Sequence, residues 1–69
     1  MKLKNVKARE VLKILGDNGF EIKRRAGTHV ILRKNERTVV VPIHKAVIPI
    51  GTLKSIEKQA GLDFREILE

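Results

Sequence analysis

The fold is decided by residues 20–42, whose sequence is FEIKRRAGTHVILRKNERTVVVP. In the first part of this stretch, apolar and charged residues alternate up to a turn at Ala26-Gly27, which is typical of a strand with one face in water. Residues 30–32 are apolar on both faces, as in a central strand. A polar turn at residues 34–37 then precedes a β-branched run that ends at Pro42. The stretch predicts a three-stranded antiparallel meander.

A first helix is predicted before the meander. Ala8, Val11 and Leu15, together with Leu12, recur at the spacing of one helix face and predict a helix near residues 7–17. Gly19 follows this segment, and glycine is the residue that most readily takes the left-handed conformation at a helix C-terminus. We therefore expect the helix to end at Gly19.

A second helix is predicted after the meander. It is marked by the apolar residues Leu53, Ile56 and Ala60, with Thr52 or a residue just before it as the N-terminal cap and Gly61 as the end. Beyond it, the sequence Asp63-Phe64-Arg65-Glu66 matches the D-x-x-E pattern of a capping box and predicts a short C-terminal helical turn.

The predicted order of elements is α-β-β-β-α, an α+β fold. No linker, repeat or low-complexity segment interrupts the chain, so residues 1–69 are expected to form a single domain. A three-stranded sheet has one face to bury, so both helices should cover that face and leave the other in water. Phe20, Phe64 and the valine, isoleucine and leucine residues are all assigned to the core.

The charge of the chain narrows the class of partner. Fifteen Lys and Arg against eight Asp and Glu give a net charge of +7. Residues 1–45 hold twelve basic and four acidic residues, whereas residues 46–69 hold three and four. Such a basic segment favours a polyanionic partner, and nucleic acid is the foremost candidate. A merely solvated basic surface is the simpler alternative.

Other features exclude several classes of protein. The chain has no cysteine and two histidines, so neither a disulfide framework nor a metal site is expected, and no cofactor is predicted. No apolar run approaches the length of a membrane span, so we expect no membrane partner and a cytoplasmic location. Trp and Tyr are absent, which argues against single-strand binders that stack bases on exposed aromatic rings.

The order of elements is that of the double-stranded-RNA-binding domain, and the residues add a closer resemblance. From about residue 7 to 68 the chain resembles the HicA toxin family, on Glu10-Val11-Leu12-Lys13, Gly19-Phe20, Arg25-Ala26-Gly27-Thr28-His29, Val41-Pro42-Ile43-His44, the stretch from Ile48 to Ile56, and Gln59-Ala60-Gly61-Leu62. The resemblance implies a small mRNA interferase with a double-stranded-RNA-binding-like fold, the toxin of a type II toxin–antitoxin system, silenced by a HicB antitoxin.

Within that resemblance, Gly27-Thr28-His29 matches a G-[ST]-H element and Gly51-Thr52-Leu53 a G-T-L element, and the first implies that His29 is catalytic. Two departures are Thr28 in place of the commoner serine and the aliphatic residues 30–32 where a second histidine or an aromatic residue often follows. Without an aromatic residue at these positions, the chain lacks a side chain on which a base would stack.

The chemistry of RNA suits a lone histidine. RNA carries its own nucleophile, the 2′-hydroxyl, so an imidazole is sufficient to take its proton or to protonate the leaving 5′-oxygen without a metal. We therefore predict that His29 is a general acid or base. A tight hairpin would set Arg24 across from His29, where the cation would favour the neutral imidazole and hold a phosphate. His44 is a candidate for a second acid or base, and a loop histidine that contacts phosphate or a partner is the simpler interpretation.

The remaining candidates are RNA-binding residues, since Lys and Arg contacts position a phosphate backbone without reading its sequence. Lys54 is expected in the first turn of the second helix, where free N–H groups attract phosphate, although a solvated helix face is an equal alternative. The predicted RNA-binding set is Lys23, Arg24, Arg25, Gly27, Thr28, His44, Lys45 and Lys54.

Two functions from different classes remain open. The first is a metal-independent endoribonuclease that cleaves mRNA through His29. The second is a non-catalytic module that binds double-stranded RNA with the same basic face. For the nuclease, an acidic HicB-type antitoxin is the expected protein partner, and it should cover His29, residues 23–25 and Lys45 because complementary charge would speed and orient its capture.

Overall fold

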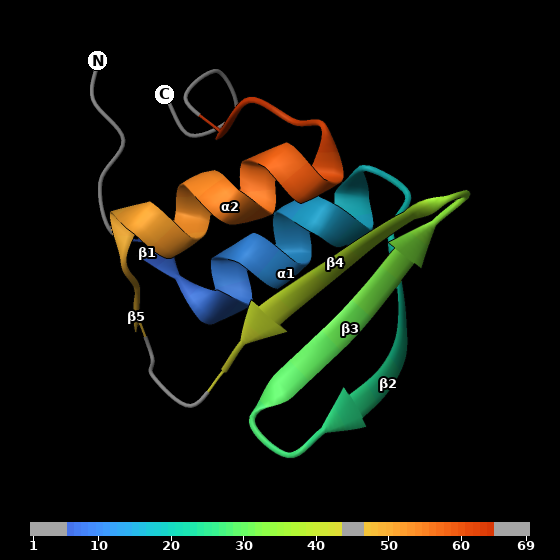
Figure 1. Ribbon diagram of the computed structural model, residues 1–69, viewed down its shortest axis with the longest axis horizontal. Coiled ribbons are helices and arrows are strands. Elements are labelled where there is room, and N and C mark those ends of the chain that lie inside the picture. Colours follow the sequence, from blue (N-terminus) through green and yellow to red (C-terminus); the bar gives the residue numbers. More distant parts are fainter. Residues whose placement is uncertain (1–5, 44–46, 65–69) are drawn as a thin grey trace.

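The computed structural model describes residues 6–43 and 47–64 and confirms the predicted α+β fold, with helices and strands in the order α-β-β-β-α (Figure 1). Two further strands of two residues each pair with one another and were not predicted. The elements are β1 (Val6–Lys7), α1 (Ala8–Asp17), β2 (Glu21–Ala26), β3 (His29–Lys34), β4 (Arg37–Pro42), β5 (Val47–Ile48) and α2 (Ile50–Ala60).

The main sheet is an antiparallel meander with strand order β2-β3-β4, so β3 is central as predicted. Its first turn is placed one residue later than the prediction, because Ala26 pairs with His29 and leaves Gly27 and Thr28 as the two turn residues. Gly27 has a φ of 61° and Thr28 does not have a positive φ, which are the φ signs of a type II′ hairpin turn with glycine first. The second turn lies at the predicted place, since Lys34 pairs with Arg37.

A β-bulge interrupts the pairing of β2 with β3. Ile22 lies opposite Leu32, but the next pair is Arg24 with Ile31, so Lys23 is the extra residue. A bulge shifts the alternation of side chains by one position. It therefore puts Ile22 and Arg24 on opposite faces, although residues two apart share a face in a regular strand. Local alternation in the sequence does not reveal this.

Both helices lie on one side of the sheet, as predicted (Figure 1). From the sheet, Val30, Leu32, Val39 and Val41 are buried against them. The other core residues are Val6, Ala8, Val11, Leu15, Phe20, Ile48, Leu53, Ile56, Ala60 and Phe64. The opposite side of the sheet is called the uncovered face here, and by pairing and alternation it carries Arg24, His29, Ile31, Arg33, Thr38 and Val40.

The prediction that every valine, isoleucine and leucine lies in the core is wrong. Four of them are substantially exposed: Ile22 at 50%, Val47 at 41%, and Val40 and Ile50 at 37% each. Val40 is exposed because it alternates with the buried Val39 and Val41 and so projects from the uncovered face. Ile22 lies on β2, an edge strand whose six residues are all exposed.

Both helices are terminated by the glycines that the sequence predicted, Gly19 for α1 and Gly61 for α2. Gly19 has a φ of 94°, and the Phe20 N–H donates to the Leu15 carbonyl at 2.9 Å while the Gly19 N–H donates to the Gly16 carbonyl at 3.1 Å. These two bonds form a Schellman motif that closes α1. Gly61 ends α2 in the left-handed conformation, as predicted.

The start of α2 differs from the prediction. The helix begins at Ile50 after Pro49, and no side chain caps it, so Thr52 is a helical residue rather than the cap. Proline suits a helix start because its fixed φ is compatible with the helix and it has no N–H to satisfy. Lys54 is consequently the fifth residue of α2 and lies beyond its first turn.

The predicted C-terminal helical turn lies partly outside the described residues, which end before Arg65 and Glu66 of the capping box. Phe64 is fully buried, as predicted. Its backbone N–H donates to the Glu57 Oε2 atom at 2.7 Å, so a carboxylate of α2 fastens the segment that follows the helix.

Candidate functional site

His29 is the first residue of the central strand and lies at the end of the β2–β3 hairpin. Its neighbours across the sheet are Ala26 on β2 and Pro42 on β4, so it projects from the uncovered face. The side chain is exposed. A ligand that approaches this face therefore meets the imidazole before it meets the core.

The two residues before His29 determine how the ring is presented. Gly27 supplies the positive φ of the two-residue turn, and the space around it is open, since a β-carbon added there would meet no atom within 4 Å beyond its chain neighbours. Thr28 Oγ1 lies 3.3 Å from His29 Nδ1. When the hydroxyl donates to Nδ1, the proton of the neutral ring is on Nε2, so this contact links the tautomer of His29 to Thr28.

The chain after β4 passes next to the same turn. The Ile43 N–H donates to the Thr28 carbonyl at 2.7 Å, which continues the β3–β4 pairing past Pro42. The predicted site residues His44 and Lys45 come next in the sequence, and both lie outside the described residues.

The three consecutive basic residues of β2 point in different directions. Arg24 lies opposite Ile31 on the uncovered face, so the expectation that it lies directly across from His29 is wrong. The cause is the turn position, because Ala26 takes that place and Arg24 becomes the diagonal neighbour of His29 on the same face. Arg25 pairs with the buried Val30 and belongs to the other face, where it stays exposed at the sheet edge.

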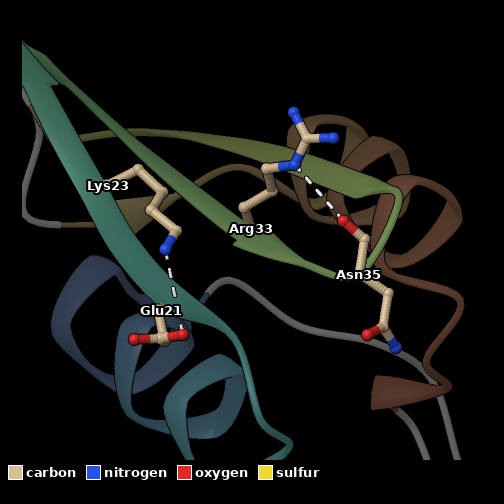
Figure 2. Close-up of polar contacts among 4 residues, drawn as sticks. All are labelled: Glu21, Lys23, Arg33 and Asn35. Carbon is tan, nitrogen blue, oxygen red and sulfur yellow. Dashed lines mark hydrogen bonds and ion pairs between the residues drawn. The ribbon is translucent and has the colours of Figure 1, made fainter.

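Lys23 differs from both arginines because a carboxylate lies near it. Its Nζ atom is 3.8 Å from the Glu21 Oε1 atom, and Figure 2 shows the amine turned along β2 toward that carboxylate. Both side chains are largely exposed, so this ion pair contributes little to stability. Of this basic run, Arg24 is the residue whose pairing places it on the uncovered face.

Arg33 also belongs to the uncovered face and was not among the predicted site residues. It lies on β3, on the same side of the strand as His29 and Ile31. It pairs with Glu21 on β2 and with Thr38 on β4. Its Nε–H donates to the Asn35 carbonyl at 3.3 Å (Figure 2). The signal in the sequence was the spacing of two between residues 29, 31 and 33, which places all three on one face of any strand.

Lys54 does not join this group. It is exposed on α2, in the helical layer that covers the opposite side of the sheet. Among the predicted residues that the structure describes, Arg24, Thr28 and His29 therefore cluster at the hairpin end of the uncovered face. Lys23 and Arg25 lie along the edge of the sheet. Lys54 lies on α2, in the helical layer on the opposite side of the sheet from His29.

Within residues 6–43 and 47–64, no group of three or more His, Cys, Asp or Glu side chains is placed to hold a metal ion. In the same part of the chain, no helix has both the length and the apolarity needed to cross a membrane.

Comparison with protein families gives a direct result. The family model described as the HicA toxin of bacterial toxin–antitoxin matches residues 8–62, which include α1, the whole meander and α2. A comparison with curated proteins gave no match. The family match covers most of the chain and includes the hairpin that presents His29, so the chain belongs to the HicA toxin family.

Proposed function

We propose that this toxin is an endoribonuclease that cleaves mRNA without a metal ion, with His29 as general acid or base. The observation that carries the proposal is the exposed imidazole on the uncovered face, with Thr28 Oγ1 at 3.3 Å and Arg24 diagonal to it. Because its substrate would be mRNA, the proposed place of action is the cytoplasm.

The proposed reaction is an internal transfer at one phosphodiester. The ribose 2′-oxygen forms a bond to the adjacent phosphorus, and the bond from phosphorus to the 5′-oxygen breaks. The products are a 2′,3′-cyclic phosphate and a 5′-hydroxyl. His29 either accepts the 2′-hydroxyl proton or donates a proton to the leaving 5′-oxygen, a type of transfer that contributes typically 10²–10⁴-fold to the rate.

The positive charge of Arg24 would stabilise the phosphate in the same step. Arg24 is the diagonal neighbour of His29 on the uncovered face, which supports a role for its guanidinium in holding the phosphate as negative charge grows on the oxygens. His44 stays a candidate for the second proton transfer, and Lys23, Arg25, Gly27, Lys45 and Lys54 stay candidates for RNA contacts around this centre.

A cleavage assay in EDTA tests the proposal. Wild-type protein should cut end-labelled RNA in the presence of the chelator, whereas His29→Ala should leave it intact and still bind it. A substrate with 2′-deoxyribose at the cleaved position should resist the wild type, because the nucleophile is removed. If neither protein cleaves but both bind RNA, the chain is the non-catalytic binding module instead.

We further propose that the antitoxin is an acidic protein of the HicB type that blocks the uncovered face. The support is geometric, because His29 and Arg24 lie on an exposed sheet face that a protein surface can cover directly. The described part of the toxin has one small core, which offers little room for two alternative packings, so steric blockage is favoured over an allosteric effect through the helices.

A further inference from the structure

The uncovered face carries basic side chains at both ends of β3, and the second end is unused by the proposed reaction. At that end, a hollow of about 280 Å³ lies beside the β3–β4 turn. Its lining residues are Gly19, Glu21, Lys23, Arg33, Lys34 and Asn35. Three of the six are cationic and one is anionic, so the hollow favours an anion.

We infer that Arg33 binds a phosphate of the RNA at a distance from the bond that is cleaved, an inference that rests on the proposed function. The substrate is accordingly an RNA chain of several nucleotides that crosses the uncovered face along β3, from His29 to Arg33. A single dinucleotide step is too short to use both positions.

The first support is that a hydrogen bond orients Arg33 through Nε while its terminal nitrogens are not used in that bond. Its Nε–H donates to the Asn35 carbonyl, and Figure 2 shows that neither terminal nitrogen of the guanidinium faces that carbonyl. Asn35 has a φ of 54°, a conformation that asparagine tolerates better than most residues. This bond restricts the guanidinium and lowers the conformational entropy lost on binding phosphate, and the paired N–H groups of arginine suit two phosphate oxygens.

The second support is the spacing along β3. Arg33 is four positions after His29, which corresponds to about 13–14 Å of strand. The two side chains share one face, so a single extended ligand reaches both. Between them lie the half-buried Ile31 and, across the sheet, the exposed Val40, which form an apolar strip suited to ribose and base rather than to phosphate.

The third support is the balance of charge around Arg33. Glu21 lies directly opposite it on β2, where a free carboxylate would compete with phosphate. The Glu21 carboxylate instead has the Lys23 amine at 3.8 Å, on its own strand. Lys34 adds a further positive charge to the lining of the hollow.

Cleavage of substrates of two lengths tests the inference. One is a dinucleotide with one phosphodiester, and the other is a single-stranded decanucleotide. Arg33→Gln should lower kcat/KM for the decanucleotide about tenfold, the usual size of a hydrogen bond to a charged group, and leave the dinucleotide unchanged. Lys13→Gln is the matched control, since Lys13 is exposed on α1 in the other layer and its replacement removes the same charge.

Binding separates this inference from the nuclease proposal. In the His29→Ala background, Arg33→Gln should weaken decanucleotide binding and reduce the salt slope by about 0.7, the contribution of one phosphate on a single strand. If the wild-type protein does not cleave RNA, the proposed nuclease activity is contradicted. The binding measurements with and without Arg33→Gln still decide whether Arg33 contacts a phosphate. Equal losses for both substrate lengths, losses matched by Lys13→Gln, or an effect confined to binding of an acidic antitoxin would each overturn the inference.

Discussion

Replacing Gly61 with alanine should destabilise the fold by an amount that follows from its conformation. Gly61 has a φ of 71°, and a side chain in this left-handed region costs about 1–2 kcal/mol. A β-carbon there would also lie 2.7 Å from Arg37 Cζ and 2.9 Å from each terminal nitrogen. The guanidinium can move, but it would lose the exposed 3.3 Å hydrogen bond to the Gln59 carbonyl, worth about 0.5 kcal/mol.

The expected loss for Gly61→Ala is therefore about 1.5–2.5 kcal/mol in the free energy of unfolding. Gly16→Ala is the matched control, because Gly16 is a helical residue of α1 and the added β-carbon would meet nothing within 4 Å outside its own helix backbone. That variant should gain about 0.5–1 kcal/mol, since alanine loses less backbone entropy in a helix. Replacing glycine with alanine is thus expected to lower the free energy of unfolding at Gly61 and to raise it at Gly16.

Urea unfolding followed by circular dichroism measures both variants. Gly61→Asn separates strain from crowding, because asparagine adopts the left-handed conformation more readily than alanine although it is larger. It should lose less stability than Gly61→Ala. The reasoning is refuted if Gly61→Ala is as stable as Gly16→Ala, or if asparagine costs more than alanine, which would make contact with Arg37 the controlling factor.

Three further predictions concern single contacts and the protein partner. Thr28→Val should lower kcat about two- to tenfold with KM unchanged, because the hydroxyl next to His29 Nδ1 is lost; Thr28→Ser should restore the rate, and equal defects in both variants would argue against this positioning role. Glu57→Ala should cost about 1.5–3 kcal/mol of stability in urea unfolding, since it leaves the Phe64 N–H without its charged acceptor, and a loss below about 0.5 kcal/mol would show that the bond is dispensable. Hydrogen exchange of the toxin with and without its antitoxin should show protection at residues 23–29, whereas protection limited to α1 and α2 would contradict blockage of the uncovered face.

Much of the fold was predictable because its signals are local. The stripe formed by Ala8, Val11 and Leu15 needs only helical spacing, and Gly19 and Gly61 mark helix ends because few other residues take a positive φ. By contrast, β1 and β5 are two residues each and pair across the length of the meander, so neither strand carries a periodic signal of its own.

The candidate site was predictable in part. His29 could be singled out from the glycine turn before it and from the resemblance to HicA toxins, and the structure places it on an exposed face. Its neighbours could not be assigned reliably. The turn occupies Gly27 and Thr28 rather than Ala26 and Gly27, and a change of one residue in register exchanges the residue opposite His29.

The sequence by itself determined the class of fold, the family and the basic character of this toxin, because composition, periodicity and motifs are properties of neighbouring residues. Only the tertiary structure decided which charged residues lie on the same face of the sheet. The bulge at Lys23 puts Ile22 and Arg24 on opposite faces although they are two residues apart. The helices cover one face of the sheet, while Arg33 lies on the other face with His29. Strand register and layer packing arise from contacts between residues far apart in the chain, and alternation alone fits more than one such register.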